Sequence, residues 1–106
     1  MAKPKLTGYR LVPRAEQDLE DIWIYGAQNW SAERADRYMD ELEATFDLLL
    51  LSPELARERT EFDPPVRLHP SGSHLIVYRI NAIHLDILRV LGGAQNWLAV
   101  LRTLDQ

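Results

Sequence analysis

The sequence predicts an α+β fold in two layers, in which an N-terminal strand, a hairpin of two helices, a three-stranded antiparallel meander and a short C-terminal helix follow one another. Two observations lead to this prediction. Apolar residues recur with helical spacing between positions 14 and 52, and short strand-like runs separated by turn residues fill positions 66 to 91. The length of 106 residues fits one domain spanning positions 1–106.

The first two elements are a strand and a helix. Thr7–Val12 is predicted to be the strand, and Pro13 fits the first turn of the helix because its missing N–H needs no partner there. From Arg14 onward the spacing becomes helical. We interpret Trp23 as a core residue and Trp30 as a half-exposed residue at the helix end. The apolar positions are Ala15, Leu19, Ile22, Trp23, Gly26 and Trp30.

A second helix follows after a tight turn, so that the two helices form a hairpin. Ser31 is the predicted N-cap, Glu33 and Arg37 form a predicted i,i+4 ion pair, and Ser52–Pro53 ends the helix. Helical spacing directs one stripe of this helix toward the core. That stripe consists of Ala35, Tyr38, Met39, Leu42, Phe46, Leu49 and Leu50.

The second half of the chain is predicted to form the sheet. Positions 54–65 are a polar loop, in which the double proline disfavours regular structure. Three antiparallel strands follow, with turn residues between them. A short helix over Gln95–Leu104 comes after Gly92–Gly93, where the chain is free to turn sharply. The predicted strands are Val66–His69, His74–Ile80 and His84–Leu91.

Charge is distributed unevenly along the chain, whose formal net charge is −4. Positions 13–63 hold five arginines against fourteen acids, whereas the two ends are mildly basic. Two interpretations stay open: a solvated acidic helix surface, or a basic sheet surface that faces an acidic partner. The absence of cysteine excludes disulfides, thiol catalysis and cysteine-type zinc sites. Because no apolar run approaches the ~20 residues of a membrane span and no signal region is evident, we expect a cytoplasmic protein without a membrane partner.

Four phrases of the sequence carry a resemblance to a known family. They are RLVPRAEQDLEDIWIYGAQNW, ADRYMDELEATFDLLLLSPELARER, VRLHPSGSHLIVYRI and LDILRVL. In their order and spacing they resemble the ParE branch of the RelE/ParE toxin superfamily, over roughly positions 7–104. The matching positions are Ala15, Asp18, Leu19, Leu49, Pro53, Arg67, Gly72, His74, Ile76, Tyr78 and Arg79.

The resemblance implies the toxin of a type II toxin–antitoxin module, encoded by two genes. ParE-like toxins poison DNA gyrase by binding, and a ParD-like antitoxin that folds onto the toxin neutralises them. DNA would then be contacted only indirectly, through the antitoxin. One departure from the family pattern is Gly92–Gly93, which stands where a histidine usually follows the R-V-L phrase. A non-toxic or re-targeted ParE homologue is therefore an alternative.

An enzymatic function is the second alternative. The sister RelE branch cleaves mRNA on the ribosome, and it keeps a basic run after the last strand and a tyrosine in the C-terminal helix. The aligned positions here are 92–95 and roughly Ala99, whose side chains neither transfer a proton nor carry charge. His69 and His74 flank a turn, but a third metal ligand at a suitable spacing is missing. We therefore expect no catalytic residue, no metal and no cofactor.

The candidate binding residues fall into two sets. Arg67, Arg79 and Arg89 are expected to line up across the sheet, where they either face an acidic partner or pair with Asp86 and the acids of the hairpin. Trp97 is either an interface anchor or a cap on the core of its own sheet. The set assigned to antitoxin binding is Trp23, Trp30, Tyr38, Arg67, Arg79 and Arg89. The set assigned to target binding, at the last strand and in the stretch from Gly92 to Gln106, is Arg89, Gly92, Gly93, Trp97 and Arg102.

Overall fold

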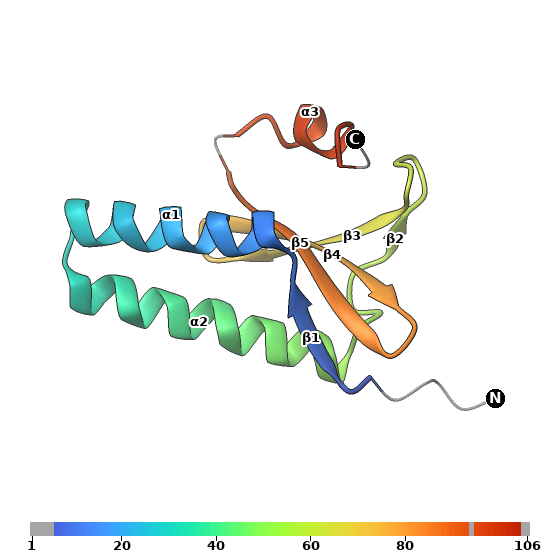
Figure 1. Ribbon diagram of the computed structural model, residues 1–106, viewed down its shortest axis with the longest axis horizontal. Helices are drawn as coiled ribbons and strands as arrows, with labels where there is room; N and C mark the ends of the chain where they lie inside the picture. Colours follow the sequence, from blue (N-terminus) through green and yellow to red (C-terminus); the bar gives the residue numbers. More distant parts are fainter. Residues whose placement is uncertain (1–5, 94, 105–106) are drawn as a thin grey trace.

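In the computed structural model, which describes residues 6–93 and 95–104, a five-stranded sheet carries a long helical hairpin (Figure 1). The order of the elements and the α+β class confirm the prediction from the sequence. The strands are β1 (Gly8–Leu11), β2 (Glu58–Arg59), β3 (Val66–Ser71), β4 (His74–Asn81) and β5 (His84–Gly92). The helices are α1 (Pro13–Asn29), α2 (Ala32–Leu51) and α3 (Trp97–Leu101).

The first and last strands of the chain are neighbours in the sheet, whose strand order is β1-β5-β4-β3-β2. β1 pairs in parallel with β5, from Gly8 opposite His84 to Leu11 opposite Ile87, and the other pairs are antiparallel. Because the chain leaves the sheet after Leu11 to enter α1, β1 does not cover the edge of β5 beyond Ile87. α1 packs along β5 there.

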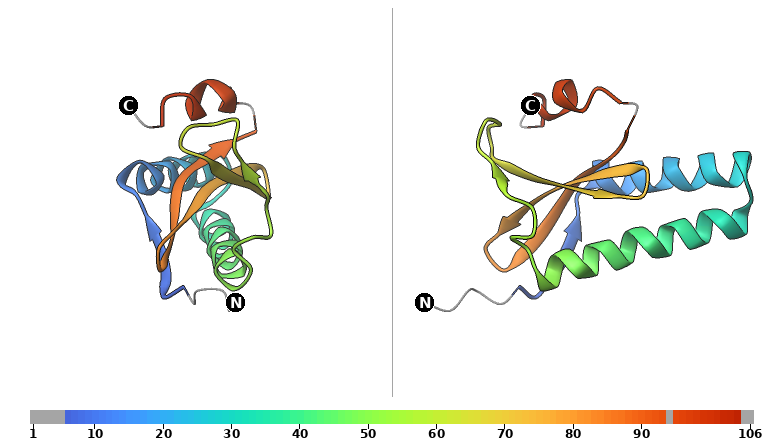
Figure 2. Two further views of the ribbon diagram at one scale, coloured as in Figure 1. Left: turned by 90° about the vertical axis from the view of Figure 1, so that its right-hand side faces the viewer. Right: turned by 180° about the vertical axis from the view of Figure 1, so that it is seen from behind.

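Different helices cover the two faces of the sheet (Figure 2). Successive side chains of a strand point to opposite faces. Ile76 and Tyr78 therefore pack with the hairpin, whereas Val77 between them packs with α3. The hairpin and the sheet are the two predicted layers, and α3 adds a short cover on the second face. The first core cluster is Ala15, Leu42, Phe46, Leu49, Ile76, Tyr78, Leu85, Ile87 and Val90, and the second is Phe62, Val66, Val77, Leu91 and Leu101.

The segment between α2 and β3 departs from the predicted loop without regular structure. Glu58–Arg59 forms the short strand β2, which pairs with Val66 and Arg67 at the start of β3. Phe62 from the same segment is buried in the second core cluster. A strand of two residues is too short for a periodic pattern to appear in the sequence, which explains why the prediction missed it.

The hairpin extends beyond the sheet, so its far end is more exposed than the apolar spacing predicts (Figure 1). Trp23, predicted to be a core residue, has 36% of its surface exposed. Its indole Nε1–H donates to Asp36 at 2.7 Å, which links α1 to α2 on the surface. Close to it the two helices approach tightly, because a Cβ added to Gly26 would lie 3.2 Å from the Cβ of Ala35.

The start of α2 confirms one local prediction and corrects another. Ser31 is the N-cap, and its Oγ accepts from the backbone N–H of Arg34 at 3.0 Å. The predicted ion pair between Glu33 and Arg37 is wrong, since these two side chains do not approach within ion-pair distance.

Within residues 6–93 and 95–104, no helix combines the length and the apolar character that a membrane crossing requires.

Candidate binding groove

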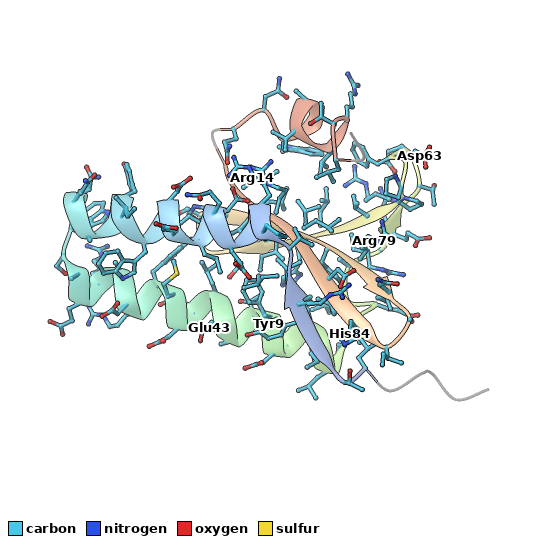
Figure 3. The ribbon with its side chains drawn as sticks, viewed as in Figure 1. Tyr9, Arg14, Glu43, Asp63, Arg79 and His84 are labelled. Carbon is cyan, nitrogen blue, oxygen red and sulfur yellow. The ribbon has the colours of Figure 1, made fainter. Side chains whose placement is uncertain are left out.

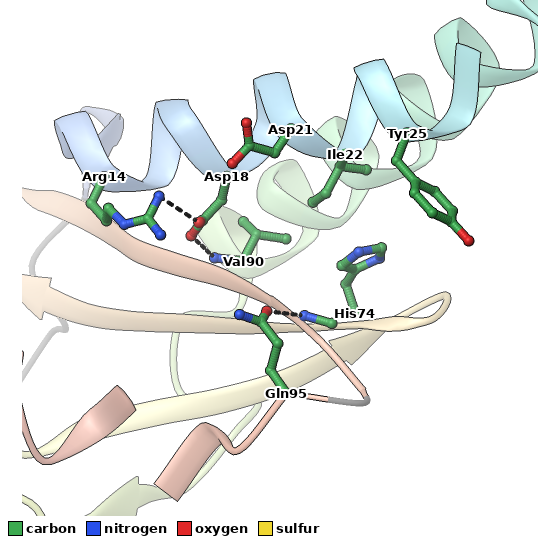
Figure 4. A pocket seen from close by; sticks show the side chains of 9 residues that line it. Arg14, Asp18, Asp21, Ile22, Tyr25, His74, Val90 and Gln95 are labelled. Atoms are coloured by element: carbon green, nitrogen blue, oxygen red, sulfur yellow. Dashed lines mark hydrogen bonds and ion pairs between the residues drawn. The ribbon is translucent and has the colours of Figure 1, made fainter. Parts of the chain in front are cut away.

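A groove of about 770 Å³ lies between the helical hairpin and the turn that joins β3 to β4. A smaller pocket of about 240 Å³ adjoins it and leads to the end of β5 (Figure 4). The two share Ile22, Tyr25 and His74. The full lining of the groove is Ile22, Tyr25, Gly26, Trp30, Arg34, Ala35, Arg37, Tyr38, Glu41, Ser73 and His74.

Large aromatic side chains of α1 and the hairpin turn are exposed at this groove. Tyr25 and Trp30 have 64% and 62% of their surface exposed. Gly26 and Ala35, which also line the groove, are small enough to let the two helices approach closely. Aromatic residues are enriched in protein-binding sites, and exposed apolar patches mark such sites. The composition of the groove is therefore that of a surface for a protein partner.

Two arginines of α2 also line the groove. Arg34 and Arg37 are exposed. The guanidinium carbon of Arg34 lies 4.3 Å from the centroid of the Trp30 ring, which is a cation–π contact. Among the described residues neither arginine has an ion-pair partner, although α2 is rich in acids. Of the lining residues, Glu41 alone carries a carboxylate.

Tyr38 joins the groove to the β3–β4 turn. Its hydroxyl lies 2.5 Å from Nδ1 of His74 and accepts from the backbone N–H of Ser73 at 3.1 Å. The turn can come this close because Gly72 has a φ of 57° and no side chain; a Cβ there would lie 2.7 Å from the Tyr38 oxygen. Burial lowers the pKa of His74 from its ordinary value of 6.5, while the negative charge of Asp18 opposes this effect. At neutral pH the imidazole is therefore neutral, and its Nδ1 can accept the Tyr38 hydroxyl hydrogen.

Side chains of α1 close the edge of β5 that β1 leaves uncovered (Figure 4). Asp18, which is 7% exposed, accepts from the backbone N–H of Val90 at 2.9 Å. The same carboxylate forms a bidentate ion pair with Arg89, with N–O distances of 2.7 and 3.0 Å. Arg14 adds a second cation 3.3 Å from Asp18. One buried carboxylate thus fixes α1 to the strand that ends beside the groove.

The three strand arginines do not line up across the sheet, which corrects the prediction. Arg67 lies opposite Tyr78 in the register, and Arg79 is the next residue of β4, so the two arginines point to opposite faces. Arg67 donates to the carbonyl oxygen of Ala56 at 2.6 Å. Arg89 is 8% exposed and bound by the α1 carboxylate, so pairing with an acid of the hairpin is its role in the fold. Arg79 lies on the sheet, half-buried and far from the hairpin turn (Figure 3).

The glycine pair at the end of β5 is held by hydrogen bonds. The Gly92 N–H donates to Oε1 of Gln95 at 2.8 Å, and the Gly93 N–H donates to the carbonyl oxygen of Ser73 at 3.1 Å. Ser73 in turn donates its N–H to Tyr38 in the groove. The β3–β4 turn therefore touches both the groove and the root of the C-terminal segment.

The remaining residues assigned to target binding differ in exposure. The ring of Trp97 lies 6.4 Å from that of Phe62, centroid to centroid, and packs on the second core cluster. Trp97 is thus a cap on the core of its own sheet, one of the two roles expected for it. Arg102, after α3, is exposed. Positions 94, 105 and 106 of the assigned stretch lie outside the described residues.

The groove contains Trp30 and Tyr38 from the predicted antitoxin set, whereas Trp23 and the three strand arginines are not part of its lining. The groove also contains three residues that the sequence analysis did not assign to antitoxin binding, namely Tyr25, Arg34 and Arg37. A signal for part of this surface exists in the sequence, because positions 34, 37, 38 and 41 follow the i, i+3, i+4, i+7 spacing of one helix face. Tyr38 belongs to this face and also packs against the first core cluster, as its place in the apolar stripe predicts.

The arrangement of a helical hairpin on a sheet closed by the β1–β5 pair defines a fold class with a solved example. The structure described as the chromosomal ParDE TA system from P. aeruginosa superimposes with a TM-score of 0.72 and 17% sequence identity, covering 83% of this chain and 96% of that chain. At this identity the likeness concerns the fold alone.

Comparisons of sequence define the family. The family model described as the ParE toxin of type II toxin-antitoxin system, parDE, matches residues 9–97. Toxin ParE1 of Caulobacter vibrioides is 38% identical over 88 residues, covering 83% of this chain and 91% of the relative. Toxin ParE1 of Mycobacterium tuberculosis is 33% identical over 84 residues, covering 78% and 86%. The chain therefore belongs to the ParE toxin family of type II toxin–antitoxin systems, as the resemblance indicated.

Proposed function

We propose that this ParE-family toxin acts by binding, that its target is DNA gyrase, and that a ParD-like antitoxin neutralises it by occupying the groove. The observation that carries the proposal is the groove of about 770 Å³ with the exposed rings of Tyr25 and Trp30. The gyrase target and the ParD-like partner follow from the resemblance to ParE toxins. A solved ParDE system that shares the fold adds support for the partner.

The groove suits an amphipathic helix of the antitoxin. In this mode of recognition, apolar side chains at helical spacing enter a hydrophobic depression of the partner. Ile22, Tyr25 and Trp30 supply such a surface along α1 and its end. Exposed Trp and Tyr side chains are also the residues in which binding energy concentrates at interfaces. We therefore expect the two rings to dominate the affinity for the antitoxin.

The end of β5 supports binding over catalysis. Gly92–Gly93 has no side chain that moves a proton, at the place where the RelE branch keeps its basic run. The two acids and the histidine of the smaller pocket already have partners within the fold. Asp18 is bound to Arg89, Asp21 accepts from Nε2 of Gln17 at 2.9 Å, and His74 is hydrogen-bonded to Tyr38.

We assign the gyrase contact to α3 and the residues around it. Leu98 and Arg102 are exposed there, while Trp97 anchors the helix to the sheet. The net charge of −4 disfavours direct contact with DNA, so DNA would be reached through the antitoxin. An inhibitor of gyrase acts in the cytoplasm, where the enzyme works.

Supercoiling by purified gyrase in the presence of the toxin tests this proposal. We expect supercoiling to stop and cleaved DNA to accumulate, and the antitoxin to reverse both effects. A toxin sample that binds its antitoxin but leaves gyrase unaffected at micromolar concentration contradicts the gyrase target. Cleavage of mRNA in a translating extract would instead favour the RelE-type alternative.

A further inference from the structure

We propose that Arg34 and Arg37 form an anion-recognition pair in the groove. The pair binds a carboxylate of the antitoxin while apolar side chains of the same antitoxin segment pack on Tyr25 and Trp30. This inference rests on the proposed antitoxin complex. It adds the chemistry of the segment that the groove accepts, which is amphipathic and carries an acid beside its apolar anchors.

The first observation is the placement of the two arginines. They stand three positions apart on α2, so their Cβ atoms are roughly 5–6 Å apart on one helix face, and both line the groove. Two like charges at this spacing repel each other. A carboxylate between them removes that repulsion and gains two charge-assisted hydrogen bonds. A guanidinium is suited to this role because its planar N–H donors match the geometry of a carboxylate.

The second observation is that the neighbouring acids Asp36 and Glu33 form no ion pair with either arginine. Asp36, between the two arginines in the sequence, accepts the indole N–H of Trp23 at 2.7 Å. Glu33 forms no ion pair with Arg37, although the i,i+4 spacing allows one. Within the described part of the chain, the two guanidinium groups are therefore left for a carboxylate from outside.

The third observation is the contact of Arg34 with the aromatic wall. Its guanidinium carbon lies 4.3 Å from the centroid of the Trp30 ring. This cation–π contact holds the guanidinium next to the surface on which an apolar anchor would pack. Apolar and acidic groups of one short segment can thus be bound side by side.

The charge around the groove favours an antitoxin segment over a second copy of the chain. Positions 13–51, which form the hairpin, hold ten acids against three arginines, so the hairpin as a whole repels a broadly acidic surface such as another hairpin. A segment with one acid at the arginine pair and apolar groups around it avoids that repulsion. The arginine pair is therefore expected to set the register of the antitoxin segment as well as its affinity.

Fluorescence anisotropy with the labelled antitoxin encoded in the same module tests the inference. Arg34→Glu and Arg37→Glu should each weaken binding by at least about tenfold, and the salt dependence of binding should become shallower. Arg57→Glu, the same change of charge at an exposed position outside the groove, should alter binding by less than about twofold. Binding within about twofold of the unsubstituted chain in both groove variants overturns the inference.

Two further measurements separate this inference from the proposed function. Weaker binding in Tyr25→Ala and Trp30→Ala, together with unchanged binding in the arginine variants, overturns the carboxylate pairing and leaves the antitoxin groove standing. An unsubstituted toxin that does not bind the antitoxin overturns both the inference and the proposed antitoxin complex.

Sedimentation of the free toxin tests for a second copy in the groove. A free toxin that sediments as a dimer and becomes a monomer with Arg34→Glu identifies a second copy as the occupant and overturns the inference. A Lys at one acidic position of the antitoxin that restores binding to Arg37→Glu supports it.

Discussion

Asp18 and Arg89 stand 71 positions apart in the chain and form a buried bidentate ion pair, with N–O distances of 2.7 and 3.0 Å. The same carboxylate accepts the backbone N–H of Val90. It therefore replaces, at one edge of β5, the hydrogen bond that a longer β1 would have supplied. Because α1 carries part of the groove and β5 leads to the C-terminal segment, this contact fixes the two proposed binding regions relative to each other.

Arg89→Ala is expected to lower the free energy of unfolding by about 3 kcal/mol, because it leaves the Asp18 carboxylate buried without its main partner. Urea unfolding followed by circular dichroism measures the change. Arg102→Ala, at an exposed position, is the matched control and should stay within about 0.5 kcal/mol of the unsubstituted protein. A loss below about 1 kcal/mol in Arg89→Ala would contradict the structural role of the pair.

Gly72→Ala is expected to destabilise the protein and to weaken antitoxin binding together. The left-handed φ of 57° costs an alanine about 1–2 kcal/mol, and its Cβ would meet the Tyr38 hydroxyl at 2.7 Å. Tyr38 must then move, which changes the inner end of the groove. Gly8→Ala is the control, since a Cβ there meets nothing within 4 Å. Unchanged unfolding and binding in Gly72→Ala would show that the turn is not held against Tyr38.

The stability of the protein should fall as the pH falls below the ordinary pKa of His74. Burial lowers its pKa in the folded state, so the unfolded chain binds the proton more readily. The contribution of the neutral imidazole is fully present above 6.5 and is lost as the pH falls toward the lower folded-state value. The Tyr38 hydroxyl and the Asp18 carboxylate are the groups that act on this imidazole.

Urea unfolding at pH values of about 7.5, 6.5 and 5.5 measures this dependence. His74→Gln should flatten the curve over this range. Equal slopes in the His74 variant and the unsubstituted protein would assign the pH dependence to other groups.

Arg102→Glu is expected to reduce inhibition of gyrase by at least about tenfold without changing the melting temperature or the antitoxin affinity, because the side chain is exposed and lies outside the groove. Trp97→Ala is a poorer probe, since it also removes packing from the second core cluster. Arg57→Glu serves as the control for charge. Equal inhibition by the Arg102 and Arg57 variants would move the target contact away from α3.

Much of the fold was accessible from the sequence because its signals are local. The spacing of apolar residues gave both helices, and the N-cap Ser31 gave the start of α2 to the residue. The parallel pairing of β1 with β5 joins residues 76 positions apart, such as Gly8 and His84, and no local pattern announces it. β2 was missed because two residues carry no periodicity.

The candidate site was less accessible, because it depends on where the hairpin ends relative to the sheet. Helical spacing assigns Trp23 to the core, yet the hairpin extends beyond the sheet and Trp23 bonds to Asp36 at the surface. Arginines on neighbouring strands appear equivalent in the sequence, whereas register and alternation send Arg67 and Arg79 to opposite faces. The sequence leaves two roles for Arg89, facing an acidic partner or pairing with an acid of the hairpin. Only the tertiary contact of Asp18 with the edge of β5 decides between them.

Antitoxin titrated into a gyrase supercoiling assay, with either the unsubstituted toxin or a Tyr25→Ala/Trp30→Ala variant, tests both the groove and the gyrase target. We expect both toxins to inhibit gyrase. Stoichiometric antitoxin should relieve inhibition by the unsubstituted toxin, whereas the variant should require at least about tenfold more antitoxin. Relief of both toxins at the same antitoxin concentration would contradict the groove as the antitoxin site. A lack of inhibition by the unsubstituted toxin would contradict gyrase as the target.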